Sequence, residues 1–127
     1  MKVKRDRGPV RYVVQDEQDD NGNPIDGAST FVLRPDNKET QMLVEDLGKR
    51  SDEPGFSWSW EYLKLALLDV EDLGDEEDEN GEPVAMDRDP DGRPSDAFLE
   101  LIRMKYRMEV ATEFMGTFNL TEQDRKN

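Results

Sequence analysis

The apolar residues of this sequence are gathered into a few short segments, and acidic stretches containing Gly and Pro separate them. The chain has a formal net charge of -14, and only 34% of its residues are hydrophobic. Stretches with little apolar surface and much like charge stay solvated. The sequence therefore predicts one small core, a single domain at residues 9–127, with the acidic stretches as exposed loops.

Two apolar segments in the first third of the chain have the composition of β-strands. VRYVV at 10–14 and STFVLRP at 29–35 are rich in β-branched and aromatic residues. The acidic connection between them carries the turn signals Asn21-Gly22 and Asn23-Pro24. It is too long for a two-residue hairpin turn, so we expect an antiparallel β-ribbon with a long exposed loop.

The segment after the ribbon has a helical pattern. Asp36 followed by Glu39 resembles a capping box, with Asp in the place usually held by Ser or Thr. The pattern predicts a helix at 37–47 that stops at Gly48.

A more apolar segment, WEYLKLALLDVEDL at 60–73, comes next and ends before Gly74. Ser59 is a suitable N-cap, and Trp58 and Leu63 have the spacing of a hydrophobic staple. Because apolar residues occur nearly all round this segment, we expect it to be the central, buried helix.

Ser95 is the predicted cap of the last long helix, whose apolar residues repeat at alternating steps of four and three. This a/d seam comprises Ala97, Leu101, Met104, Met108, Ala111, Met115 and Phe118. Two interpretations stay open. The seam packs on the central helix, or it also meets another protein chain. In the second case Met104, Met108 and Met115 would form an adaptable protein-binding surface.

Residues 74–92 form a predicted acidic loop. From Asp69 to Asp91 there are twelve acids and one base, Arg88. Such a block repels itself and resists packing, and only a short strand at 83–86 is expected within it. The expected fold class is α+β: an N-terminal antiparallel β-ribbon packed with about three helices, plus long acidic loops.

Residues 1–8 form a basic arm before the first strand. Its bases are Lys2, Lys4, Arg5 and Arg7. One interpretation is a mobile terminus, and the other is an arm that docks on an acidic partner or on nucleic acid. Direct nucleic-acid binding by the whole chain is not expected, because its net charge of -14 is repelled by phosphates.

The residue types exclude several classes of function. The chain contains no Cys and no His, which removes disulfides, thiolate metal sites and every catalytic triad that uses imidazole. No catalytic constellation or Gly-rich phosphate loop is present, so we expect neither an enzyme nor a bound cofactor. No apolar run approaches 18 residues, and no signal peptide or membrane-spanning segment is expected.

The acidic loop contains the opening of a calcium-binding pattern. Asp87, Asp89 and Asp91 stand two residues apart and Gly92 follows, as at positions 1, 3, 5 and 6 of an EF-hand loop. The twelfth position, where a bidentate Glu is required, is Phe98. Asp-Pro and Asp-Gly pairs also form turns, so these aspartates are at most weak candidates for a divalent ion.

The net charge also allows a DNA mimic that occupies the groove of a host nucleic-acid-binding protein. Mimicry requires carboxylates held rigidly at the spacing of phosphates. Most acids of this chain lie in stretches punctuated by Gly and Pro, which argues for mobility instead. The mimic remains an alternative function, as does a module that binds divalent ions weakly.

Three segments carry a resemblance to a known group of proteins. They are STFVLRP at 29–35, LALLDVEDLGDEEDENGEPVAM at 65–86 and LTEQDRKN at 120–127. In this order the chain resembles small morphogenesis proteins of tailed bacteriophages, including tail assembly chaperones. The resemblance covers roughly residues 29–127. Asp36, where the pattern has Leu after the proline, departs from it.

The resemblance implies a non-enzymatic role in assembly of the phage head or tail, through protein–protein contacts. The expected partners are phage head or tail proteins and further copies of the chain itself. The expected location is the host cytoplasm during assembly. Whether the protein stays in the virion or acts as a transient helper is open.

Overall fold

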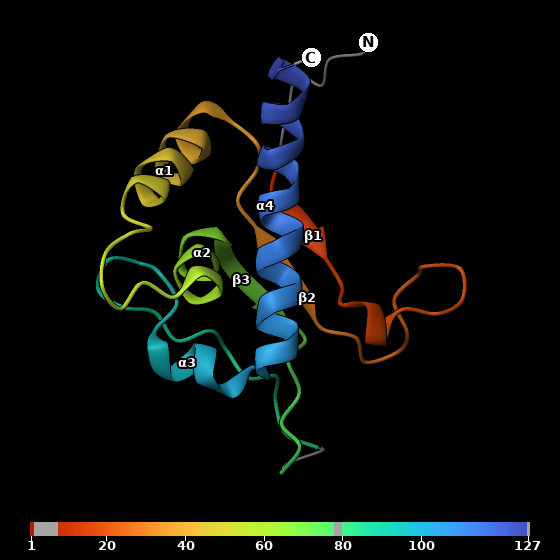
Figure 1. Cartoon of the computed structure of the whole chain (residues 1–127). Helices are drawn as coiled ribbons and strands as arrows, with labels where there is room; N and C mark the ends of the chain where they lie inside the picture. Colours follow the sequence, from red (N-terminus) through yellow and green to blue (C-terminus); the bar gives the residue numbers. More distant parts are fainter. Residues whose placement is uncertain (2–7, 78–79, 127) are drawn as a thin grey trace.

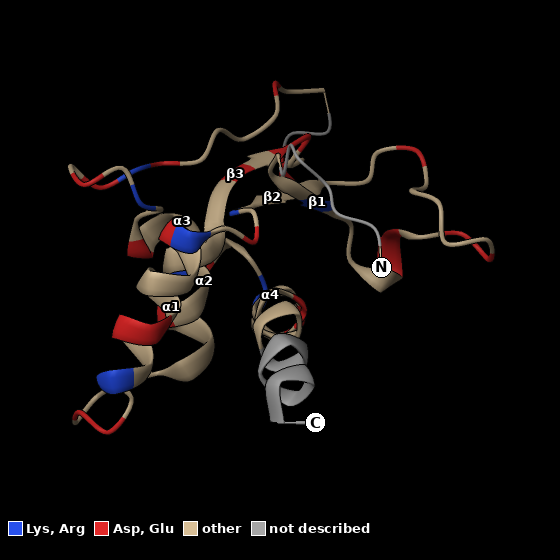
Figure 2. Cartoon of the chain, turned by 90° about the horizontal axis from the view of Figure 1, so that it is seen from above, with Lys and Arg blue, Asp and Glu red and all other residues tan. Residues whose placement is uncertain are grey.

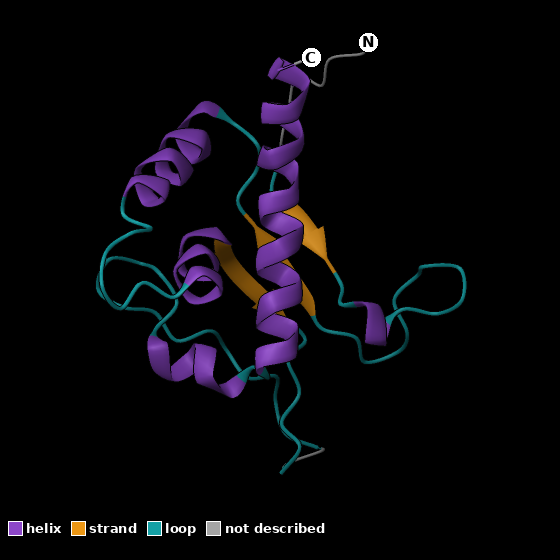
Figure 3. Ribbon diagram, viewed as in Figure 1, coloured by secondary structure: helices purple, strands orange, loops and turns teal. Residues whose placement is uncertain are grey.

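The structure of the protein is a computed structural model that describes residues 1, 8–77 and 80–126. Within these residues a three-stranded sheet has the order β1-β2-β3, with all neighbours antiparallel. Its strands are β1 (Val10–Tyr12), β2 (Thr30–Leu33) and β3 (Leu67–Glu71). The helices are η1 (Gln15–Glu17, 3-10), α1 (Lys38–Lys49), α2 (Trp58–Ala66), α3 (Asp96–Leu101) and α4 (Met104–Lys126). The α+β class is confirmed (Figures 1 and 3).

The predicted ribbon is confirmed in both its strands and their direction. Val10 pairs with Leu33 and Tyr12 with Phe31. β2 is the central strand, which explains why three consecutive residues, Phe31, Val32 and Leu33, are all buried. Alternate side chains point to opposite faces, and only Phe31 and Leu33 belong to the main core cluster.

The predicted central helix at 60–73 is wrong in its second half. α2 begins at Trp58 with Ser57 in the N-cap position, so Ser59 is not the cap. It ends at Ala66, and β3 starts at the next residue. The strand pairs with the second edge of β2, and Val70 lies opposite Phe31. If α2 continued past Ala66, the backbone N–H and C=O groups on this edge of β2 would have no partners. Pairing with β3 provides these partners, and for this reason residues 67–71 form a strand despite their helical sequence pattern.

α1 follows its prediction apart from its ends. The side chain of Asn37, and not that of Asp36, caps it by accepting a hydrogen bond from the backbone N–H of Thr40 at 2.9 Å. The helix passes through Gly48 and ends at Lys49. It packs on α2 and buries Leu47.

The predicted last helix is two helices. Ser95 caps the first as expected, because its hydroxyl accepts the N–H of Phe98 at 3.1 Å. The chain then leaves the helical conformation at Ile102, whose φ and ψ are -90° and 128°. No Gly or Pro occurs between Asp96 and Met115, so the break has no local cause in the sequence. Ile102 is 5% exposed, and its burial accompanies the break.

The four α-helices lie on one side of the sheet, as Figure 2 shows from above. α4 packs mainly on α2, and α2 also contacts α1. The buried residues from the last third of the chain are Met86, Phe98, Leu99, Ile102, Val110, Ala111, Phe114 and Phe118. The core is therefore formed between the sheet and the helices that cover this one face.

The described residues of the predicted acidic loop, 74–77 and 80–92, belong to no helix or strand, and the short strand predicted at 83–86 does not form. Instead the loop runs beside the exposed edge of β3. The N–H of Val84 donates to the carbonyl of Leu73 at 2.7 Å, and the Arg88 guanidinium donates to the carbonyl of Leu68 at 2.7 Å. Met86 is buried in the core. These contacts cover an edge that would otherwise be open to pairing with another chain.

Candidate functional site

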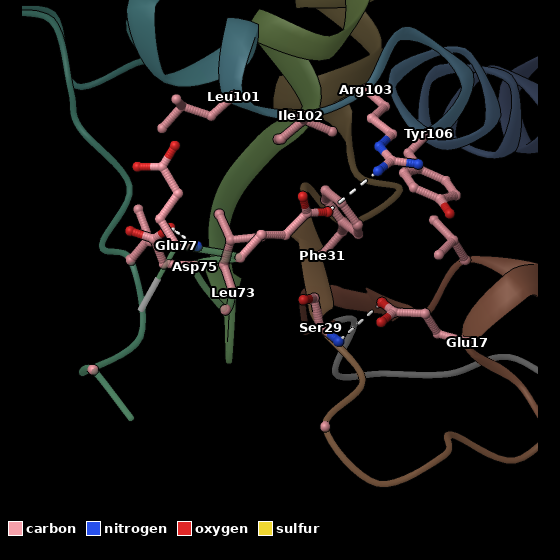
Figure 4. Close-up of a pocket in the computed structure, with 16 residues that line it drawn as sticks. Glu17, Ser29, Phe31, Leu73, Asp75, Glu77, Leu101, Ile102, Arg103 and Tyr106 are labelled. Atoms are coloured by element: carbon pink, nitrogen blue, oxygen red, sulfur yellow. Dashed lines mark hydrogen bonds and ion pairs between the residues drawn. The ribbon is translucent and has the colours of Figure 1, made fainter. Parts of the chain in front are cut away.

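An open groove of about 920 Å³ lies where the loop after β3 meets the junction of α3 and α4 (Figure 4). Its apolar lining includes the buried Phe31 and Ile102 and the half-buried Leu73 and Val84. The acids that line it are Glu17, Asp75, Glu76 and Glu77. We call it the acidic groove. Its form, an apolar base between carboxylates, suits an extended segment that carries both apolar and basic side chains.

Hydrogen bonds already engage part of the lining. Arg103, the one base that lines the groove among the described residues, donates to Glu76 at 3.2 Å. Glu17 accepts the N–H of Ser29 at 3.1 Å (Figure 4). Most of the negative charge of the groove is therefore not matched by a base that lines it.

Beside the groove, the surface carries an apolar stripe. Leu101, Met104 and Met108 have exposed fractions of 67%, 64% and 47%. Met104 and Met108 stand four residues apart on α4, and Leu101, the last residue of α3, also lines the acidic groove. We call these three residues the methionine stripe. The predicted protein-binding residues Met104 and Met108 thus lie together on the surface.

The third predicted methionine lies elsewhere. Met115 is half-buried and packs against the core. The predicted a/d seam therefore does not form one surface: Ala111 and Phe118 are buried, whereas Met104 and Met108 are exposed. The change from exposed to buried occurs within α4, between Met108 and Ala111, so the later part of the seam is not available to another chain. The predicted binding residues Lys2, Lys4, Arg5 and Arg7 lie outside the described residues.

Contacts with η1 and β1 fix one side of α4. Asp16 accepts hydrogen bonds from Lys105 at 2.8 Å and from Tyr106 at 3.1 Å. The hydrogen bond from Lys105 is the main cause that lowers the pKa of Asp16. On β1, Tyr12 donates to Glu109 at 2.6 Å, and burial, followed by this hydrogen bond, raises the pKa of the Tyr12 hydroxyl. These contacts place Tyr106 at the groove.

A second polar cluster ties α2 to the end of the acidic loop and to α3. Lys64 contacts Asp96 at 2.9 Å and Asp89 at 3.5 Å. The indole N–H of Trp60 donates to the same Asp96 at 3.0 Å, and the guanidinium of Arg107 lies 5.0 Å from the centre of the Trp60 ring. The hydrogen bond from Lys64, followed by that from Trp60, lowers the pKa of Asp96.

The indole N–H resonance of Trp60 will report the titration of Asp96. Because the hydrogen bonds from Lys64 and Trp60 lower its pKa, we expect the midpoint, measured by NMR, below the ordinary 3.8. The stabilisation from the lowered pKa is present above 3.8 and is lost as the pH falls through the folded-state value. Asp96→Asn should remove this titration. A midpoint at or above 3.8, or a titration that survives in Asp96→Asn, contradicts the assignment.

The three aspartates of the calcium-like pattern form a tight turn. The N–H of Gly92 donates to the carbonyl of Asp89 at 2.8 Å, and Gly92 has a φ of +85°. The carboxylate of Asp91 accepts the N–H of Arg93 at 3.0 Å, and that of Asp89 contacts Lys64. Among the described residues, no group of three or more acids forms a potential metal site.

The same turn occurs in the loop of the ribbon. There the N–H of Gly22 donates to the carbonyl of Asp19 at 3.0 Å, and Gly22 has a φ of +80°. Both turns have the sequence Asp-x-(Asn/Asp)-Gly-x-Pro, at 19–24 and 89–94, and both close with a bridge to the proline. The sequence at 78–83 repeats the pattern, although 78–79 lie outside the described residues. The repeated motif is therefore a signal for turns in this sequence.

No helix in the part of the chain that the structure describes is long and apolar enough to span a membrane. Comparisons of the chain with protein-family models, with curated proteins and with solved structures gave no match.

Proposed function

We propose that this protein is a non-enzymatic binding protein of bacteriophage morphogenesis, which acts through protein–protein contacts during assembly of the head or tail. The observation that carries the proposal is the methionine stripe, Leu101, Met104 and Met108, exposed beside the acidic groove. The phage assignment rests on the resemblance of residues 29–127 to small phage morphogenesis proteins.

The position of the stripe favours a protein partner. Its residues lie on helices that contacts to Asp16 and Trp60 hold in place, so the surface is ordered before binding. Exposed apolar side chains that stand together are a frequent mark of interaction sites, and Met adapts to the shape of a partner because its side chain is unbranched and flexible. The neighbouring carboxylates would add selectivity for a partner with basic residues beside its apolar contact.

The double substitution Met104→Glu with Met108→Glu is expected to lower recovery of the phage partner at least about tenfold, because charges would then face the apolar contact of the partner. The melting temperature should change little, since both side chains are exposed. Pull-down from a lysate of infected cells, with mass spectrometry to identify head or tail proteins, measures the effect.

Met42→Glu provides the matched control. Met42 is 55% exposed but lies on α1, away from the stripe, and its substitution should leave recovery unchanged. Equal recovery of head or tail proteins by the wild type and the double variant would contradict the proposal. Measuring the amount of the protein in purified phage particles distinguishes the two versions of the proposal. A fixed copy number indicates a virion component, and absence from finished particles indicates a transient helper.

A further inference from the structure

We propose that the acidic groove binds the basic arm, residues 1–8, of a second copy of this chain. The inference deepens the proposed function, since it rests on the chain acting as a protein-binding protein. It concerns the acidic groove, which adjoins the methionine stripe and shares Leu101 with it, and a different partner. The variants that test it change no residue of the stripe. Self-association and capture of phage proteins can therefore fail independently.

The charges of the two segments are complementary. The described lining of the groove has four carboxylates, and its one base, Arg103, contacts Glu76. The arm carries Lys2, Lys4, Arg5 and Arg7 against a single acid, Asp6. Individual exposed ion pairs are weak, but several pairs that form together can direct one segment into one groove.

The alternation of side chains in the arm also matches the groove. In an extended chain, Lys2 and Lys4 point to one side and Val3 to the other. The groove has exposed carboxylates beside an apolar base at which the half-buried side chains of Leu73 and Val84 are accessible. An extended arm can thus place Val3 on the apolar base while its lysines reach the acids.

The direction of β1 favours the arm of another copy. The arm leads into Val10, which pairs with Leu33 at one end of the ribbon, whereas the groove is lined by Ser29 and Phe31 towards the other end. To reach its own groove, a chain would have to reverse before Val10 and return along the sheet. The arm of a second copy approaches the groove from solvent without this reversal.

Charge reversal tests the contact directly. In the arm variant, Lys2→Glu is combined with Lys4→Glu, and in the groove variant, Glu76→Lys is combined with Glu77→Lys. Sedimentation velocity measures self-association of the full chain at about 0.01 M and about 1 M salt, where the Debye length is about 30 Å and about 3 Å. We expect the wild type to associate at low salt and to dissociate at high salt. Each variant alone should weaken association at least about tenfold.

An equimolar mixture of the two variants decides between a second copy and the chain's own arm. In the mixture the unchanged arm of the groove variant meets the unchanged groove of the arm variant, and the reversed arm meets the reversed groove. Association should therefore return towards the wild-type level. A mixture that stays monomeric overturns the proposal, because an arm bound in its own chain cannot be rescued by mixing. A wild type that is monomeric at low salt overturns it as well.

The control variant combines Glu45→Lys with Asp52→Lys, which changes the net charge as the groove variant does, at exposed positions away from the groove. It should associate as the wild type does, and an equal weakening in this control would overturn the proposal by assigning the effect to net charge. Thermal melting checks that each variant folds. The arm variant changes no residue of the described fold, so its result stands even if the groove variant is unstable.

Discussion

Leu67→Ala is expected to lower the free energy of unfolding by about 2–5 kcal/mol. Leu67 is 3% exposed, and it is the residue at which α2 ends and β3 begins. Its side chain belongs to the main core cluster, so truncation loses apolar burial and leaves a cavity. Denaturation with urea, followed by tryptophan fluorescence, measures the change, since Trp58 and Trp60 lie on α2.

Leu68→Ala is the matched control for this prediction. Leu68 is the next residue of β3 and is only half-buried, so we expect a loss of about 1 kcal/mol or less. The loss of intrinsic strand preference is the same in both variants and cancels from the comparison. Equal losses at the two positions, or a change below about 0.5 kcal/mol at Leu67, would show that this segment does not pack as an edge strand with Leu67 facing the core.

Arg107→Met is expected to lower the free energy of unfolding by about 1–3 kcal/mol. One guanidinium nitrogen of Arg107 donates to the carbonyls of Leu99 and Ile102 at the end of α3. The carbonyl of Leu99 also accepts the backbone N–H of Ile102 at 3.1 Å. The same guanidinium stacks over the Trp60 ring. Methionine keeps the apolar stem but removes the donors, so the break between the helices loses the contact that holds it.

Arg103→Met is the control. It tests whether the loss of unfolding free energy comes from the carbonyl contacts of Arg107 or from the removal of any cation near the break. Arg103 lies in the break itself, but its exposed side chain forms an ion pair with the exposed Glu76, at 3.2 Å. Loss of this exposed ion pair should lower the free energy of unfolding by well under about 1 kcal/mol. Urea denaturation of both variants gives the comparison. A loss at Arg103 as large as that at Arg107 would contradict the role of the two carbonyl contacts.

The candidate site was predicted only in part. The sequence pointed to Met104 and Met108 as a binding surface, and the structure places both on the surface of α4. Met115 had the same spacing in the sequence but packs against the core. The acidic groove was not foreseen, because it joins Glu17, Asp75 and Arg103, residues far apart in the chain that only the fold brings together.

Local chemistry was sufficient for the elements whose signals lie within a few residues. The ribbon followed from two β-branched segments and their pairing direction, and the cap at Ser95 followed from the preference of its hydroxyl for the N–H of Phe98. The acidic loop followed from like charge and turn residues, because such a segment has too little apolar surface to pack as a regular element.

Only the tertiary structure decided where helices give way to other structure. The segment after Ala66 has a helical pattern, but β2 is a central strand that needs a hydrogen-bonding partner on each edge. The run of three consecutive apolar residues, Phe31, Val32 and Leu33, was the signal in the sequence for such a strand. Likewise, neither Gly nor Pro ends α3 at Leu101; the burial of Ile102 and the contacts of Arg107 with the carbonyls of Leu99 and Ile102 accompany the break. A sequence records local preferences, whereas the choice between two elements depends on partners that fold beside them.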